Sequence, residues 1–126
     1  MKYVLDASAL IAAILREPGA EIVRSVLVRS VMSSVNMVEV GSRLIDIGYN
    51  PEAALRHLDA LGVNVVPFDE ALAAVAARLR ADTRAAGLSL GDRACLALAV
   101  REKAVALTAD RAWARIDVGC EIKLIR

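Results

Sequence analysis

Aromatic residues are scarce in this chain, at 3% of its 126 residues. Proteins that bind single-stranded nucleic acid by base stacking need exposed aromatic rings, so this mode of binding is not expected. The single histidine, His57, lies in the helical pattern ALRHLDAL, where it is expected on the helix surface or partly packed. A ribonuclease that uses a pair of histidines as acid and base is therefore excluded.

Cysteines are few, and long hydrophobic runs are absent. The two cysteines, Cys95 and Cys120, form no C-x-x-C pair, and Cys95 lies in an apolar helical pattern that favours a buried free thiol. The longest uncharged apolar stretch, residues 7–15, is too short for the roughly 20 residues that cross a bilayer. The N-terminal MKYVLDAS reads as a strand rather than a cleavable signal peptide. We expect a cytoplasmic protein.

Several catalytic motifs are absent. The chain has no glycine-rich phosphate loop of the Walker or dinucleotide type. Ser8 has no base partner for a nucleophilic triad. A phosphoaspartyl enzyme would carry a second acid two residues after Asp6, and that position is Ser8.

The residues that are present predict one α/β domain over residues 1–126. Hydrophobic residues make up 57% of the chain, so the core is expected to be aliphatic, and the net charge is only +1. Helices are predicted from Asn36 to Gly48, from Asn50-Pro51 to Gly62, from Asp69 to Gly87, and from Ser89 to about Arg101. Strands are predicted at 3–6, 30–33, 63–67, 104–108 and 121–125. This alternation predicts a mainly parallel sheet with helices on both faces.

Four acidic residues lie near predicted junctions between a strand and a helix: Asp6, Glu39, Asp92 and Asp110. Asp6 and Asp110 directly follow apolar strands, whereas Glu39 and Asp92 are expected in the first turn of helices. The ends of parallel strands and the starts of the following helices share one edge of the sheet, where ligands bind. Carboxylates ~4 Å apart repel by about 4 kcal/mol at an effective dielectric of ~20, which a divalent cation would relieve.

Each acid also has a structural interpretation. Asn36-x-x-Glu39 and Ser89-x-x-Asp92 both have the spacing of a capping box. Asp6 or Ser8 could cap the next helix, and Asp110 could do the same. For each acid alone capping is the simpler interpretation, and their common edge favours a metal site for the set.

An all-oxygen site suits Mg²⁺ or Mn²⁺ better than zinc. Water activated by such an ion can attack a phosphodiester. Ser8 and Thr108 could orient a ligand or a water, or could bond to the local backbone instead. Arg93, Arg111 and Arg115 lie beside the acids and are candidate phosphate contacts, or ordinary solvated surface.

The segments VLDASALIAAI, SSVNMVEV, LSLGDRACLALAV and ALTADRAW resemble, in order and spacing, the PIN-domain family and within it the VapC-type toxins. The resemblance covers essentially the whole chain. It implies a five-stranded parallel sheet flanked by helices and Mg²⁺- or Mn²⁺-dependent cleavage of RNA. Asp6, Glu39, Asp92 and Asp110 match the acidic quartet of the family, with Ser8 and Thr108 in support. Asp6 and Asp92 are expected as the most direct ligands, and Asp110 as the least secure one.

The resemblance also implies a homodimer and a VapB-like antitoxin whose C-terminal segment fills the active-site groove. A mean hydropathy of +0.49 is compatible with apolar surface covered by partners, and equally with an alanine-rich core. The expected function is that of a metal-dependent endoribonuclease toxin of a type II pair. The alternatives are a catalytically silent domain that binds RNA or protein, and a metal-dependent DNA nuclease.

Overall fold

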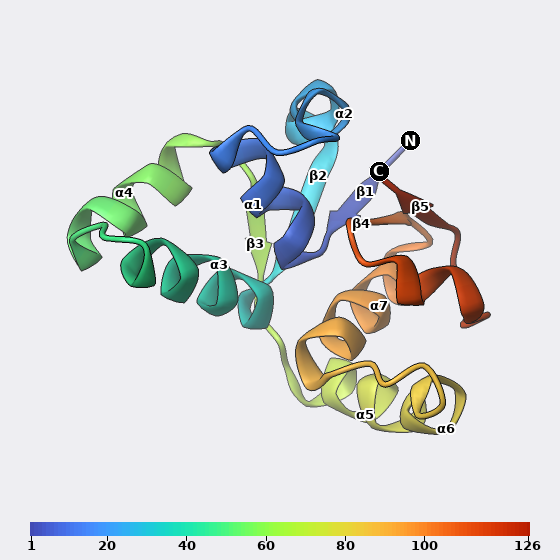
Figure 1. Cartoon of the computed structure of the whole chain (residues 1–126). Helices are drawn as coiled ribbons and strands as arrows, with labels where there is room; N and C mark the ends of the chain where they lie inside the picture. Colours follow the sequence, from blue (N-terminus) through green and yellow to red (C-terminus); the bar gives the residue numbers. More distant parts are fainter.

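The computed structural model, which describes residues 1–126, contains one sheet of five short strands, all parallel (Figure 1). The order across the sheet is β3-β2-β1-β4-β5, with β1 in the centre. The strands are β1 (Tyr3–Leu5), β2 (Ser30–Ser33), β3 (Asn64–Val66), β4 (Val105–Thr108) and β5 (Ile122–Leu124). All five strands and the parallel sheet expected from the sequence are confirmed.

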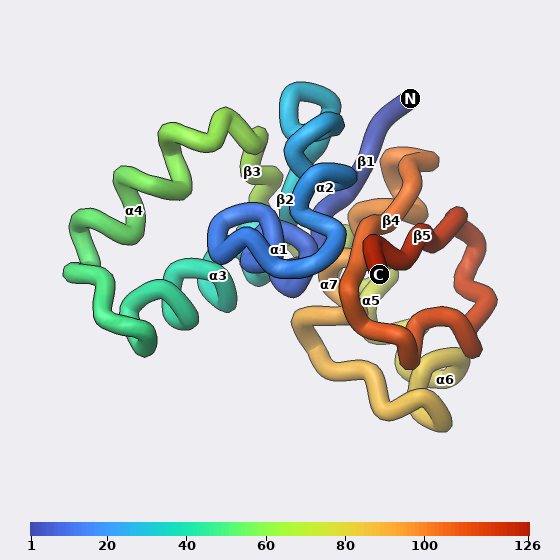
Figure 2. Tube along the Cα trace, turned by 45° about the horizontal axis from the view of Figure 1, so that its top comes forward, coloured from blue at the N-terminus to red at the C-terminus, as the bar shows by residue number.

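Seven α-helices and two short 3₁₀ helices connect the strands. They are α1 (Ala7–Leu15), α2 (Ala20–Val26), η1 (Leu27–Arg29), α3 (Ser34–Asp46), α4 (Pro51–Ala60), α5 (Glu70–Arg78), α6 (Arg80–Thr83), α7 (Leu90–Glu102) and η2 (Arg111–Arg115). The α3–α4 hairpin projects from the sheet in both Figure 1 and Figure 2. No helix is long and apolar enough to cross a membrane.

Three predicted helix starts are confirmed, and one is wrong. Asn50, Asp69 and Ser89 cap α4, α5 and α7 by accepting backbone N–H groups. Asn36 does not cap α3, because β2 runs directly into this helix and Ser33 at the strand end accepts the N–H of Val35 instead. Asn36 therefore lies inside the helix, buried.

Two other boundaries differ from the prediction. The helix expected from Asp69 to Gly87 ends at Arg78 and continues as the separate short helix α6. Glu39 lies in the second turn of α3 rather than in its first, because the helix begins earlier than predicted. The short helix α2 has no counterpart in the sequence prediction. A turn precedes it, it runs directly into η1, and its few residues give no clear helical period.

Alternating residues of the strands feed two apolar layers, one on each face of the sheet. Leu5, Met32 and Leu107 pack with α1–α4, whereas Val4 and Ala106 pack with α5 and α7. The core is aliphatic as predicted, except for the fully buried Trp113 of η2, and Cys95 is a buried free thiol. Helices on both faces are thereby confirmed.

The strand order reverses between β1 and β4. The chain leaves β1 towards β2 on one side, and returns through α5–α7 to enter β4 on the other side. In open parallel sheets this switch point is where the loops after the strands diverge and leave a crevice. The first residues after β1 and after β4, including Asp6 and Asp110, lie at this point.

Shortening a side chain in the central strands should destabilise the fold more than shortening an exposed one. Leu107 of β4 is fully buried against the helices α1–α4, so Leu107→Ala should lower the free energy of unfolding by about 2–5 kcal/mol. Val28 is 92% exposed, and Val28→Ala should change it by less than about 0.5 kcal/mol. Urea unfolding followed by circular dichroism measures both, and equal losses would contradict the packing described.

Candidate active site

Asp6 is the buried centre of the site. It lies directly after β1 with a side chain 4% exposed. Its backbone carbonyl accepts the first N–H groups of α1, but its side chain makes no capping hydrogen bond. The interpretation of Asp6 as a helix-capping side chain is therefore wrong. A carboxylate buried at a switch point, and not used for capping, is available for chemistry.

Two hydroxyl groups hold one oxygen of this carboxylate. Ser8 Oγ donates to Asp6 Oδ2 at 2.6 Å, and Thr108 Oγ1 donates to the same atom at 2.9 Å. Both hydroxyls also accept backbone N–H groups of the β4 loop, at 2.9 Å from Ala109 and 3.0 Å from Asp110. The backbone bonding expected as one interpretation of Ser8 and Thr108 is therefore present, and both hydroxyls also hold the Asp6 carboxylate.

Glu39 reaches the site from α3 and is solvent-exposed. Its Oε1 accepts a hydrogen bond of 2.8 Å from Asn36 Nδ2, and Asn36 Nδ2 also donates to the carbonyl of Gly91 at 3.0 Å. The pairing of Asn36 with Glu39 is real, but it is a contact between side chains within one helix and not a capping box.

Asp92 and Asp110 each serve as structural caps. The Ser89–Asp92 capping box is confirmed, since the N–H of Ser89 donates to Asp92 Oδ2 at 2.8 Å and the N–H of Asp92 donates to Ser89 Oγ at 3.2 Å. Asp110 Oδ1 accepts the N–H of Ala112 at 2.9 Å and so caps η2. For these two residues the structural interpretation holds, and a second role requires their remaining oxygens.

All four carboxylates share one arrangement: one oxygen bonds to the protein, and the other has no protein hydrogen bond. The anchored atoms are Asp6 Oδ2, Glu39 Oε1, Asp92 Oδ2 and Asp110 Oδ1. Carboxylate oxygens are the donors that Mg²⁺ and Mn²⁺ prefer. The donor set therefore fits a hard divalent cation in its chemistry.

Asp6, Glu39 and Asp92 are close enough for their charges to interact, but their carboxylates do not converge on a single point. No three His, Cys, Asp or Glu side chains lie close enough together to hold an ion jointly. The metal role of the four acids therefore stays a prediction.

Burial and charge raise the pKa of Asp6 to about 6. Burial is the largest cause, the hydrogen bonds from Ser8 and Thr108 act in the opposite direction, and the charges of Asp92 and then Glu39 raise the pKa further. Coulomb repulsion reaches further than coordination does, so Asp6 feels both acids although they do not share an ion-binding point with it. A bound cation would relieve this repulsion.

The three arginines proposed as phosphate contacts differ in availability. Arg93 is partly buried and donates from Nη1 to the carbonyl of Ala76 at 3.1 Å, so it joins α7 to α5. Arg111 and Arg115 of η2 are exposed and make no side-chain hydrogen bond. These two remain candidates for phosphate contact, whereas Arg93 has a structural partner.

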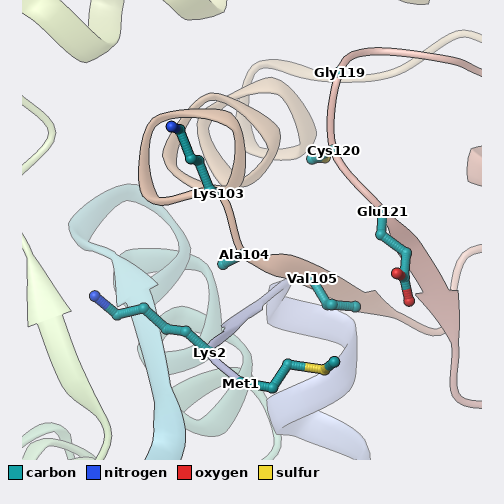
Figure 3. Close-up of a pocket in the computed structure, with 8 residues that line it drawn as sticks. All are labelled: Met1, Lys2, Lys103, Ala104, Val105, Gly119, Cys120 and Glu121. Carbon is teal, nitrogen blue, oxygen red and sulfur yellow. The ribbon is translucent and has the colours of Figure 1, made fainter.

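The structure has two cavities, and the larger one, of about 370 Å³, lies at the edge of the sheet opposite to the acidic residues (Figure 3). It is lined by Lys2, Val105 and Glu121 among others, all at or just before the starts of β1, β4 and β5. The carboxylates follow the ends of these strands. The cavity is therefore separate from the acidic site.

The geometry agrees with comparison to a known family. The PIN domain model matches residues 3–119, which is most of the chain. This chain belongs to the PIN domain family. The family and the fold expected from the sequence are thereby confirmed. No curated protein sequence matches the chain.

Solved structures share the fold of this PIN domain at low identity. The toxin–antitoxin complex from Klebsiella pneumoniae has a TM-score of 0.79 and 18% identity, covering 99% of this chain and 98% of that one. DNA-bound VapBC from Salmonella typhimurium has a TM-score of 0.76 and 20% identity, covering 100% and 99%. VapBC-1 from nontypeable Haemophilus influenzae has a TM-score of 0.75 and 22% identity, covering 99% and 98%.

The part that Asn36 and Gly91 play in this PIN domain is not predicted from the sequence. The helix cap predicted at Asn36 is wrong, and no sequence pattern singles out Gly91. The two residues are 55 positions apart, and only the crossing of α3 with α7 brings them together. The one available signal was the Asn36-x-x-Glu39 spacing, which indicates a side-chain pair within a helix as readily as a capping box.

Removing the charge of Asp6 should stabilise the protein at neutral pH in the absence of divalent ions. The pKa of Asp6 is about 6 when folded, against 3.8 for an ordinary carboxyl. The charge of Asp6 opposes folding increasingly as the pH rises from 3.8 to about 6, and fully above that range. Asp6→Asn should therefore raise the free energy of unfolding by up to about 3 kcal/mol at pH 8, and by little at pH 4.

Urea unfolding from pH 4 to pH 8 in EDTA measures this difference. The exposed Asp59 provides the control, because Asp59→Asn should follow the wild-type protein at every pH. A constant difference between Asp6→Asn and wild type across the range would contradict the raised pKa.

Proposed function

We propose that this PIN domain is a metal-dependent endoribonuclease and the toxin of a type II toxin–antitoxin pair. The observation that carries the proposal is the buried Asp6 at the β1–β4 switch point, with one oxygen held by Ser8 and Thr108 and the other without a protein partner. Glu39 and Asp92 lie near enough to raise its pKa. A protein with no use for a cation at this point would gain nothing from this repulsion.

Asp6 and Asp92 are the residues that we expect to hold Mg²⁺ or Mn²⁺ most directly, with Glu39 completing the site. Asp110 is exposed and uses one carboxylate oxygen to cap η2, which suits an indirect role through water. When bound, the divalent ion supplies activation of a water molecule and stabilises negative charge on the phosphate.

The chain's own residues provide orientation and phosphate binding. Ser8 and Thr108 keep Asp6 Oδ2 turned towards the β4 loop, which leaves Oδ1 for the site. The exposed Arg111 and Arg115 follow Asp110 in η2, where they can contact an RNA backbone. Hydrolysis is expected to leave 5′-phosphate and 3′-hydroxyl ends.

Two sets of observations support the assignment as a toxin with an antitoxin partner. The structures that share this fold over almost their whole length include VapBC and other toxin–antitoxin complexes. The chain also exposes an apolar groove of about 240 Å³ between α3 and α4, lined by Val38, Ile45 and Leu55 among others. Exposed apolar surface of this kind suits a protein partner. We propose that the partner is a VapB-like antitoxin and that its C-terminal segment fills the groove at the acidic site. We also propose that the toxin forms a homodimer.

A catalytically silent PIN domain that binds RNA or protein is the second candidate. The specific observation in its favour is that no three acidic side chains are gathered closely enough to share an ion. A silent domain would bind its partner equally well with and without Mn²⁺.

Purified protein free of antitoxin should cut RNA at discrete sites when Mn²⁺ or Mg²⁺ is present, and should be inactive in EDTA. Asp6→Asn removes the central charge with little change of shape, so cleavage should fall at least about 100-fold. Sequencing of new 5′-phosphate ends in total RNA measures both effects. Asp59→Asn should cut like the wild type.

Matched RNA and DNA strands separate the remaining alternatives. Preferential cleavage of the DNA strand would contradict the substrate proposed and support a DNA nuclease. Cleavage by Asp6→Asn at the wild-type rate would contradict the site. A folded protein that binds Mn²⁺ but cuts neither strand would favour the silent domain.

The partner prediction has its own measurement. In solution the purified chain should have about twice the 13.4 kDa mass of the monomer by light scattering. Co-expression with the small protein encoded next to it should give a co-purifying complex that does not cut RNA. A monomer with no inhibitory neighbour would contradict the toxin assignment while leaving the nuclease assignment open to the cleavage experiment.

A further inference from the structure

Asn36 is a polar side chain at a fully buried position of α3, with 0% of its surface exposed. Its Nδ2 donates both hydrogens, one to Glu39 Oε1 at 2.8 Å and one to the carbonyl of Gly91 at 3.0 Å. Both partners are acceptors, so the amide can be oriented only with its nitrogen towards them. Its Oδ1 is buried without a partner, a cost that an apolar side chain of the same size would avoid.

Gly91 completes this contact from α7. A Cβ at Gly91 would lie 2.6 Å from both Cδ and Oε1 of Glu39, and would collide with Oε2 as well. No other residue leaves room for the carboxylate there. Because glycine inside a helix lowers its stability, the space for Glu39 has a cost of its own.

We propose that Asn36 and Gly91 are positioning residues that hold the Glu39 carboxylate against the first turn of α7, one residue from Asp92, before any ion binds. The inference rests on the proposed function, because Glu39 is one of the acids that we propose hold the divalent cation. Asn36 does not contact substrate or ion, and acts through Glu39.

Charge explains why Glu39 needs this support. It is exposed on α3, and its charge and that of Asp6 repel each other. Without the hydrogen bond from Asn36, the flexible side chain would turn away into solvent. An ion would then have to order the Glu39 side chain and bring it back from solvent, and would bind more weakly.

Thermal unfolding of the whole chain tests the Gly91 contact. In wild type, Gly91→Ala should lower the melting temperature, because displacing the Glu39 carboxylate leaves one hydrogen of the buried Asn36 amide without its acceptor. In a Glu39→Ala background, Gly91→Ala should raise it, as alanine normally does in a helix. Gly41 is the matched control, since a Cβ there meets only Leu58 Cδ1 at 3.7 Å, so Gly41→Ala should raise it in both backgrounds.

Calorimetric titration with Mn²⁺ tests the role of Asn36. Asn36→Leu keeps the size of the side chain and removes the donor, and should weaken Mn²⁺ binding by about 10- to 100-fold. In the Glu39→Ala background the same substitution should cause no further loss. A purely structural role of Asn36 would give equal losses in both backgrounds.

Each result decides a separate question. The proposal is overturned if Gly91→Ala raises the melting temperature of the wild type as Gly41→Ala does, or if Asn36→Leu weakens binding equally with and without Glu39. A wild-type protein that binds no Mn²⁺ overturns the proposed function together with the positioning role. Failure of the inference alone leaves wild-type Mn²⁺ binding intact.

Discussion

The charge of one buried carboxylate, Asp6, shapes the rest of the site. It lies where β1 ends, at the point where the strand order reverses, and its desolvation opposes ionisation. Ser8 from α1 and Thr108 from β4 donate to it and so join the two strands that define the switch point. The same hydroxyls accept backbone N–H groups of the β4 loop, which fixes the loop as well as the acid. Burial, orientation and loop geometry therefore depend on one cluster.

The surrounding acids serve the fold in a way that is compatible with the chemistry proposed for them. Asp92 completes a capping box, Asp110 caps η2, and each keeps one oxygen free of protein hydrogen bonds. Structural and functional interpretations of such residues are compatible, because a carboxylate has two oxygens. The anchored oxygen limits where the free oxygen can lie, so a capping hydrogen bond at a helix start also positions the oxygen proposed to bind the ion.

Local patterns carried most of the fold prediction. The caps at Asn50, Asp69 and Ser89 mark helix starts through hydrogen bonds to the next few residues, and the apolar runs around Leu5 and Leu107 mark buried strands. These signals act over a few residues and can be read directly from the sequence. Prediction failed at α2, which is too short for a clear period, and at the start of α3, where strand and helix join without a separating turn.

The class of the fold, the parallel sheet and the four acids at its carboxyl edge follow from the amino-acid pattern, because periodicity and chain order dictate which residues follow each strand. The differences among those acids arise from packing. It buried Asp6 and exposed Glu39, and it placed Gly91 beneath the Glu39 carboxylate with Asn36 bonded to both. The reason is that burial and the crossing of α3 with α7 arise from packing between segments distant in the chain, which no local pattern encodes.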